Sequence, residues 1–233
     1  MINKGLRREF VDIYIVRHGQ TLFNYLERVQ GWSDSPLTAL GIQQGKEVGE
    51  HLSLVEFDAI YSSDLKRAVD TAKYIKEKQK SDLEIKETEL LREAYYGGFE
   101  GGSEEGPWTP VFENYDYAVE AIQKNFSESL NKILKEQSNK DIRDIIAGSD
   151  DMNLAENYEQ YSSRINRFLD TLLAEDYNKV LIVCHGGTSQ LLLEILLEES
   201  GNISEPENCS TSIVEVRNNT IELVKFNDIS YLK

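Results

Sequence analysis

The alternation of hydrophobic and polar positions along this 233-residue chain predicts strands separated by helices. Short apolar runs rich in β-branched residues are typical of buried strands, and they occur at 11–16, 57–61 and 180–184. Residues 83–88 alternate apolar and polar positions, as a half-exposed or edge strand does. Two further alternating runs, 211–216 and 220–226, predict a closing hairpin near the end of the chain.

Between these strands, apolar residues at three- and four-residue steps predict helices. The expected N-caps are Thr38 for a helix to about Leu52, the stretch Ser62-Ser63-Asp64 for a helix through residue 75, and Thr188 for a helix through residue 199. A further helix is expected over 156–176. Alternating strands and helices favour an α/β fold, and no linker or repeat divides the chain. We therefore expect one domain over residues 1–233.

The stretch 103–155 does not fit this alternation and is predicted to be a helical insertion. Its first part carries apolar residues at helical spacing, which predicts one long amphipathic helix through Phe112, Tyr115, Val119, Ile122, Phe126, Leu130 and Ile133. A shorter helix and a loop are expected over 139–155. An insertion of this kind would cover the sheet edge or act as a lid over the mouth of a site.

Chemically active side chains follow two of the predicted buried strands. Arg17 and His18 come directly after the first strand, before a glycine, and His185 comes directly after the most apolar strand. Ligands of open parallel sheets bind where strands end and helices begin. A cation, an imidazole and accessible backbone at such a place suit an anionic group such as phosphate.

Lys66 and Arg67 lie in the first turn of a predicted helix, where the helix macrodipole disfavours cations. A bound anion would explain them. Local pairing with Asp64 or Asp70 is the alternative.

The composition argues against two classes of partner, nucleic acids and membranes. The net charge of −16 argues against binding to nucleic acid, which needs a basic protein face. Any anion-binding site must be a small positively charged region in an otherwise negative protein. No apolar run can span a bilayer, and residues 1–10 lack the apolar segment of an export signal, so a cytoplasmic protein without a membrane partner is expected. Two cysteines and three histidines give neither a disulfide framework nor metal-ligand spacing. Cys184 is expected to be a core residue, with a reactive thiol as the alternative.

These motifs resemble, in order, those of the histidine phosphatase superfamily, also called the phosphoglycerate-mutase-like family. The resemblance is carried by Arg17-His18-Gly19, a loop around Gln30-Gly31, Ser62 to Ala72, Glu93 ahead of an aromatic-glycine run, Cys184-His185-Gly186-Gly187, and a tail at 227–232. It implies a three-layer α/β/α sandwich with a mostly parallel central sheet and a helical insertion at about 103–155.

The same resemblance implies roles for these residues. His18 would be the nucleophile that forms a phosphohistidine, and Glu93 would be the proton donor, with Glu100 as a competitor for that role. The phosphoryl group would be held, without a cofactor or metal, by Arg17, Asn24, Gln30, Gly31, Arg67, His185 and Gly186. Asn24 alone would otherwise be interpreted as a turn residue, and Trp32 is expected to pack rather than to bind substrate.

Three activities within the family stay open. Mutases carry basic residues after the glutamate motif and prefer asparagine after His-Gly, whereas this chain has no Lys or Arg from Gly101 to Gln123 and has Gly187. Both departures favour a phosphatase for a small phosphomonoester such as a sugar phosphate. A cofactor-dependent mutase, with Arg28, Arg92 or Arg143 binding a second anionic group, and a silent phospho-ligand-binding member are the alternatives. The pattern makes no prediction of oligomeric state.

Overall fold

The computed structural model describes residues 10–115, 117, 125–198, 203–218 and 220–233. Its centre is a six-stranded sheet with the order β3-β2-β4-β1-β5-β6. The strands are β1 (Phe10–Arg17), β2 (Ala59–Ser63), β3 (Ile85–Thr88), β4 (Lys179–Cys184), β5 (Thr211–Arg217) and β6 (Thr220–Asp228). The predicted strands and the hairpin are confirmed, with β2 and β3 each beginning two residues later than expected.

The sheet is mostly parallel. Strands β3, β2, β4 and β1 run in parallel, while β5 is antiparallel to β1 and forms a hairpin with β6. Strand β1 lies between β4 and β5, with Val16 opposite Val183 and Arg17 opposite Cys184. This register ends β1 and β4 at the same level, so the residues that follow them, His18 and His185, emerge side by side.

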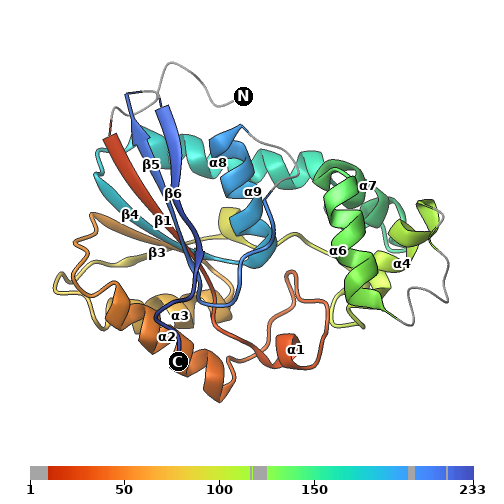
Figure 1. The fold of residues 1–233 in the computed structure, drawn as a ribbon, viewed down its shortest axis with the longest axis horizontal. Helices are drawn as coiled ribbons and strands as arrows, with labels where there is room; N and C mark the ends of the chain where they lie inside the picture. The colour runs from red at the N-terminus through yellow and green to blue at the C-terminus, as the bar shows by residue number, and fades with distance from the viewer. Residues whose placement is uncertain (1–9, 116, 118–124, 199–202, 219) are drawn as a thin grey trace.

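Helices cover both faces of the sheet, as Figure 1 shows. On one face, α2 (Ala39–His51) and α3 (Lys66–Lys76) pack on a cluster that includes Val16 and Val183. On the other face, α8 (Tyr158–Ala174) and α9 (Gly186–Leu197) pack on a cluster that includes Ile13 and Ile15. Successive strand residues point to opposite faces, so β1 contributes to both cores. The result is the expected three-layer α/β/α sandwich.

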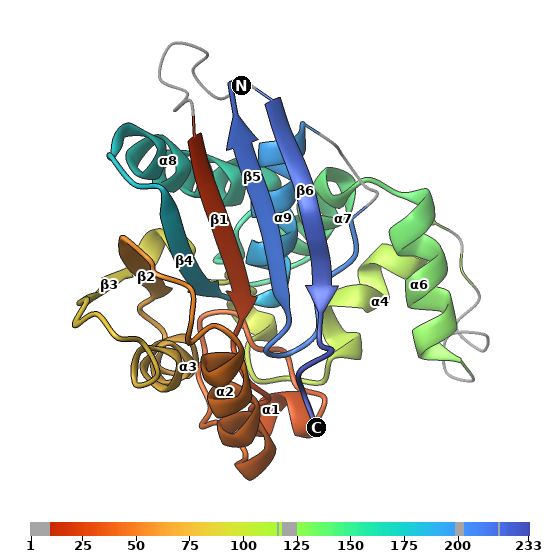
Figure 2. The ribbon, with the colours of Figure 1, turned by 60° about the vertical axis from the view of Figure 1, so that its left-hand side comes forward.

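The remaining helices are short or lie outside the sandwich. Helix α1 (Leu22–Tyr25) and two 3-10 turns, η1 (Glu89–Leu91) and η2 (Gly97–Phe99), belong to the loops around the sheet. Helices α4 (Glu105–Asn114), α6 (Phe126–Glu136) and α7 (Asn139–Gly148) gather to one side of the sandwich around a small apolar cluster of their own (Figure 2). None of the helices in the described ranges combines the length and apolar composition of a membrane span.

The prediction of one long helix after Phe112 is wrong. Helix α4 ends at Asn114, the amide of Tyr117 returns to the carbonyl of Phe112, and α6 starts after Asn125. The rings of Phe112 and Phe126 meet edge to face, with centroids 5.8 Å apart. The apolar spacing therefore serves two helices that pack on a shared cluster, and spacing alone does not reveal the break. Val119 and Ile122 of the predicted helix lie outside the described residues.

Two predicted caps are also wrong. Helix α3 begins at Lys66 after Leu65, and Asp64 instead forms an ion pair with Arg92, whose Nη2 lies 2.5 Å away. Helix α9 begins at Gly186, directly after His185, and ends by Leu197, while Glu199 lies outside the described residues. In both places the side chain that could cap has a tertiary partner, which the local pattern does not contain.

Candidate active site

The two histidines meet at the carboxyl ends of β1 and β4. His18 is 3% exposed and His185 is 1% exposed, and their ring centroids lie 5.2 Å apart. Arg67, from the first turn of α3, is 1% exposed, and its Nε donates to His18 Nε2 at 3.2 Å and to His185 Nδ1 at 3.1 Å. The fold thus brings together three residues that the sequence singled out on separate elements.

The hydrogen bonds define the protonation of both rings. His18 Nδ1 lies 2.8 Å from the carbonyl oxygen of Gly19, which can only accept, so Nδ1 carries the proton and Nε2 keeps a lone pair. His185 Nδ1 accepts from Arg67, and its Nε2 donates to Ser63 Oγ at 2.8 Å. Burial, and then the charge of Arg67, hold the pKa of both histidines well below 6.5. Both imidazoles are neutral at pH 7.

Arg67 also organises the loop that precedes α2. Its Nη1 donates to Asp34 at 3.0 Å, and its Nη2 donates to the carbonyl of Gly31 at 2.7 Å. The alternative of local pairing holds for Lys66, which pairs with Asp70 at 2.6 Å, but not for Arg67. Asp34 was not identified from the sequence, because its partner lies 33 residues away in the chain.

Glu100 holds the same loop from the opposite side. Its carboxylate accepts from the amides of Gly31, Trp32, Ser33 and Tyr96 and from the Ser33 hydroxyl, at 2.5 to 3.1 Å. A Cβ on Gly31 would lie 2.2 Å from the carbonyl oxygen of Ala94, so only glycine fits there. The Gly31 amide therefore faces Glu100, whereas the resemblance had implied that it faces a ligand. Trp32 packs, as expected, against Tyr95.

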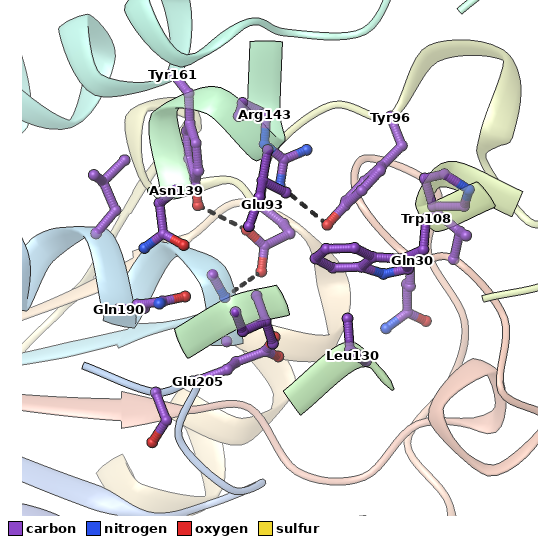
Figure 3. A pocket seen from close by; sticks show the side chains of 18 of the residues that line it. Gln30, Glu93, Tyr96, Trp108, Leu130, Asn139, Arg143, Tyr161, Gln190 and Glu205 are labelled. Carbon is purple, nitrogen blue, oxygen red and sulfur yellow. Dashed lines mark hydrogen bonds between the residues drawn. The ribbon is translucent and has the colours of Figure 1, made fainter. Parts of the chain in front are cut away.

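Glu93 is held on the side of the site formed by α8 and α9. It is 7% exposed, and its carboxylate accepts from the amide of Ala94 at 2.9 Å and the amide of Gly187 at 2.9 Å. It also accepts from the hydroxyl of Tyr161 at 2.7 Å (Figure 3). A Cβ on Gly187 would approach the Glu93 carboxylate to 2.8 Å, so Gly187 makes room for it.

Two further residues that support Glu93 were missed in the sequence. Tyr161 contacts its carboxylate, and Arg164 donates to its backbone carbonyl at 2.7 Å while pairing with Glu156 at 2.8 Å. Both lie on the buried face of α8, three residues apart. An arginine at helical spacing from apolar residues is the signal that could have identified Arg164, whereas no such signal marks Tyr161.

The other candidate ligands surround the cavity beside His18. Arg17 Nη1 donates to the carbonyl of Pro206 at 2.7 Å and pairs with Glu205 at 3.1 Å. Asn24 Oδ1 accepts from the backbone amide of Thr21 and caps α1, which confirms a short helix there. Gly186 forms the first turn of α9, directly after His185.

A cavity of about 660 Å³ joins these residues. Arg17, His18, Asn24, Gln30, Glu93, Arg143 and Gly186 all line it. Of the four buried side-chain polar atoms without a hydrogen-bond partner in the described part of the chain, three are N–H donors on this wall, namely Arg17 Nε, Gln30 Nε2 and Arg143 Nη1. Buried donors normally find acceptors, so the cavity is built for a ligand rich in acceptor oxygens. The described residues contain no group of three His, Cys, Asp or Glu arranged to hold a metal.

Known proteins are similar to this chain in sequence and in fold. A model of the histidine phosphatase superfamily (branch 1) matches residues 13–229. Fructose-2,6-bisphosphatase TIGAR of Xenopus tropicalis is 31% identical, over 88% of this chain and 82% of that protein. The metal-independent phosphoserine phosphatase of Arabidopsis thaliana is 27% identical, over 96% and 84%. The crystal structure of a phosphoglycerate mutase from Bacillus anthracis str. Sterne matches with a TM-score of 0.82 and 27% identity over 98% of both chains. Since the family model spans nearly the whole chain, this protein belongs to the histidine phosphatase superfamily.

Proposed function

We propose that this chain hydrolyses small phosphomonoesters through a phosphohistidine on His18, without a metal ion. The observation that carries the proposal is the state of His18, a buried neutral imidazole with its Nε2 lone pair beside Arg67. A neutral imidazole is the nucleophilic form. The unpartnered donors of Arg17 and Gln30 line the same cavity and supply the acceptor-rich group with hydrogen bonds.

In the first step, His18 Nε2 attacks phosphorus, a P–N bond forms, and the bond from phosphorus to the ester oxygen breaks. The Arg67 N–H that donates to Nε2 passes to a phosphoryl oxygen, because an anionic acceptor forms the stronger hydrogen bond. Arg17 and Arg67 stabilise the charge on the equatorial oxygens, and the Nδ1 lone pair of His185 accepts from Arg67 and orients its guanidinium. Glu93, entering as the acid, gives its proton to the departing ester oxygen.

In the second step, water attacks the phosphohistidine. Glu93, now a carboxylate, takes a proton from this water, the P–N bond breaks, and inorganic phosphate and neutral His18 are released. The donors around Glu93 keep its carboxyl group in one orientation for both transfers. The guanidinium groups of Arg67, which is buried, and Arg17, which is partly buried, supply the positive charge that the transferring phosphoryl group needs, which supports catalysis without a metal.

Hydrolysis is favoured over mutase activity by Gly187, which leaves space for the glutamate, and by the lack of Lys and Arg from Gly101 to Gln123. The similarity to the phosphoglycerate mutase of Bacillus anthracis keeps the mutase as the second candidate. The names of the relatives, a phosphoserine phosphatase and a fructose-2,6-bisphosphatase, support phosphate release from a small ester.

The test follows free phosphate from a panel of monoesters, in the presence of a chelator, alongside conversion of 3-phosphoglycerate to 2-phosphoglycerate by ³¹P NMR. We expect phosphate release without isomerisation. Turnover of an ester radiolabelled in its phosphate, quenched during the reaction, should trap an acid-labile, base-stable phosphoenzyme. His18→Asn should abolish both turnover and labelling.

The matched control is His51→Asn, because His51 lies away from the cavity, stacked on Tyr231. This variant should keep full activity. Isomerisation without net hydrolysis would replace the phosphatase with the mutase. Phosphate binding without turnover would mean a silent binding protein, and loss of activity with the chelator would overturn metal independence.

A further inference from the structure

Arg143 is a half-buried cation that the proposed chemistry does not use. It lies on α7, outside the sandwich, yet it lines the same cavity as His18 and Glu93. Its Nη1 is buried without a hydrogen-bond partner, and no carboxylate of the described residues lies within ion-pair distance of its guanidinium. Buried N–H donors normally have an acceptor, so the buried Nη1 of this cation lacks one.

The guanidinium of Arg143 is held in a fixed orientation. It lies over the ring of Tyr96, 4.6 Å from the centroid, and 5.8 Å from the ring centroid of Tyr161. Its Nη2 donates to the Tyr96 hydroxyl at 3.1 Å, as Figure 3 shows. Burial raises the pKa of Tyr96, so this hydroxyl stays protonated and keeps its own hydrogen to donate. Arg143 and Tyr96 together present N–H and O–H donors from one rigid pair.

The position of this pair relative to Glu93 shows which part of a substrate would reach it. Tyr161 contacts Arg143 through its ring and Glu93 through its hydroxyl, at 2.7 Å. Arg143 is therefore one side chain away from the group that protonates the departing oxygen. A substrate group bound by Arg143 belongs to the part of the ester that leaves, not to the phosphoryl group that is transferred.

We propose that Arg143 and Tyr96 form a second subsite that binds a carboxylate of the leaving group, so that the preferred substrates are small phosphorylated carboxylic acids. This inference rests on the proposed function. It also revises the expectation of a sugar phosphate. That expectation rested on the lack of Lys and Arg from Gly101 to Gln123, but Arg143, which lies beyond that stretch on α7, supplies the cavity with a cation.

A carboxylate fits the subsite better than a second phosphate. One edge of the guanidinium is taken by Tyr96 and its faces lie near two rings, which leaves few donors for a tetrahedral dianion. Glu104 and Glu205 line the same cavity and would repel a second doubly charged group. A planar single charge needs only the remaining N–H and the Tyr96 hydroxyl.

Four small esters test the subsite in a matched design. Phosphoserine and 3-phosphoglycerate carry a carboxylate, whereas phosphoethanolamine and glycerol 3-phosphate are their counterparts without it. We expect a higher kcat/KM for both carboxylated members. Arg143→Gln should lower their kcat/KM by roughly 10- to 100-fold, the loss typical of a hydrogen bond to a charged group, and leave the other two nearly unchanged.

Lys140→Gln is the matched control, because it removes a cation from the same helix at an exposed position paired with Asp144. It should alter none of the four esters. Equal losses on all four esters in Arg143→Gln, with an unchanged melting temperature, would overturn the subsite while leaving the phosphatase intact. A selective loss on fructose 2,6-bisphosphate would assign the subsite to phosphate instead. Absence of phosphate release from every ester, including p-nitrophenyl phosphate, would reject the proposed function itself.

Discussion

The single N–H on Nε of Arg67 donates to both imidazoles. The orientation of both rings therefore depends on the position of Arg67. The donor lies 3.2 Å from His18 and 3.1 Å from His185, and all three side chains are almost fully buried. A protonated imidazole here would face a permanent positive charge in a medium of low polarity. The cluster is therefore stable only while both histidines are neutral.

This arrangement predicts how stability depends on pH. The folded pKa of both histidines lies well below the unfolded value of 6.5, so below that pH the unfolded chain binds more protons. Their contribution is fully present above pH 6.5 and is lost as the pH falls toward the folded pKa, by about 1.4 kcal/mol per pH unit for each group. Urea unfolding between pH 5.5 and 7.5 measures it.

The double variant His18→Asn, His185→Asn should flatten this dependence between pH 5.5 and 6.5. The same slope in the double variant would mean that other groups cause it.

At this scale the sequence was informative where a residue follows a strand or starts a helix. Arg17, His18, Arg67 and His185 could be identified because local patterns place them at strand and helix ends. Asp34 and Tyr161 could not, because each acts through a partner more than thirty residues away. Arg143 was only one of three arginines considered, since nothing local shows which of them enters the cavity.

At the scale of elements, two nearby glutamates have different roles. The difference follows from the loop between α1 and α2 and from the turns around η1 and η2. Glu93 faces the cavity and is supported from α8 and α9, whereas Glu100 accepts five hydrogen bonds and fixes residues 31–33. Because four of its five donors are backbone amides, an amide side chain in place of Glu100 would bring donors against donors. We therefore expect substitutions of Glu93 and Glu100 to have different effects on activity and on stability.

We predict that Glu93→Gln lowers kcat most for alkyl phosphates and least for p-nitrophenyl phosphate, whose leaving group needs no proton. Glu100→Gln should lower activity by a similar factor on both esters and reduce the melting temperature by several degrees, through a loss of about 1–3 kcal/mol. Steady-state kinetics with both esters and thermal unfolding distinguish them. If Glu100→Gln showed the leaving-group dependence instead, the assignment of the acid would be wrong.

The order of elements was predictable because strands and helices differ in hydrophobic period, and the sheet, its hairpin and the helices on both faces are all confirmed. The lobe formed by α4, α6 and α7 was less predictable. Two helices that pack on one cluster keep the same apolar spacing as a single helix. The hydrophobic period along the sequence therefore does not show that α4 ends at Asn114.

At the scale of the whole molecule, the charge opposes the proposed substrate. The chain carries a net charge of −16, and a doubly negative phosphate ester must approach through that field before it meets Arg17 and Arg67. The Debye length falls from about 30 Å at 0.01 M salt to about 8 Å at physiological salt, so added salt screens this long-range repulsion more than the short contacts in the buried site.

Raising sodium chloride from 10 mM to 150 mM should therefore increase kcat/KM for a dianionic ester, mainly through KM. The measurement is initial rates at low substrate concentration and constant pH. A decrease would mean that the local positive field of the cavity extends into solvent and attracts the substrate.

The position of β1 between β4 and β5 has a consequence for how the chain is made. Strand β1 is synthesised first, but its partner β4 starts at Lys179, about 160 residues after β1 ends at Arg17. At translation rates of about 5–20 residues per second, the apolar strand waits roughly 8 to 30 seconds with both edges unpaired. Nascent chains stalled before β4 should therefore recruit chaperones and lack a formed phosphate site, however long they are given to fold.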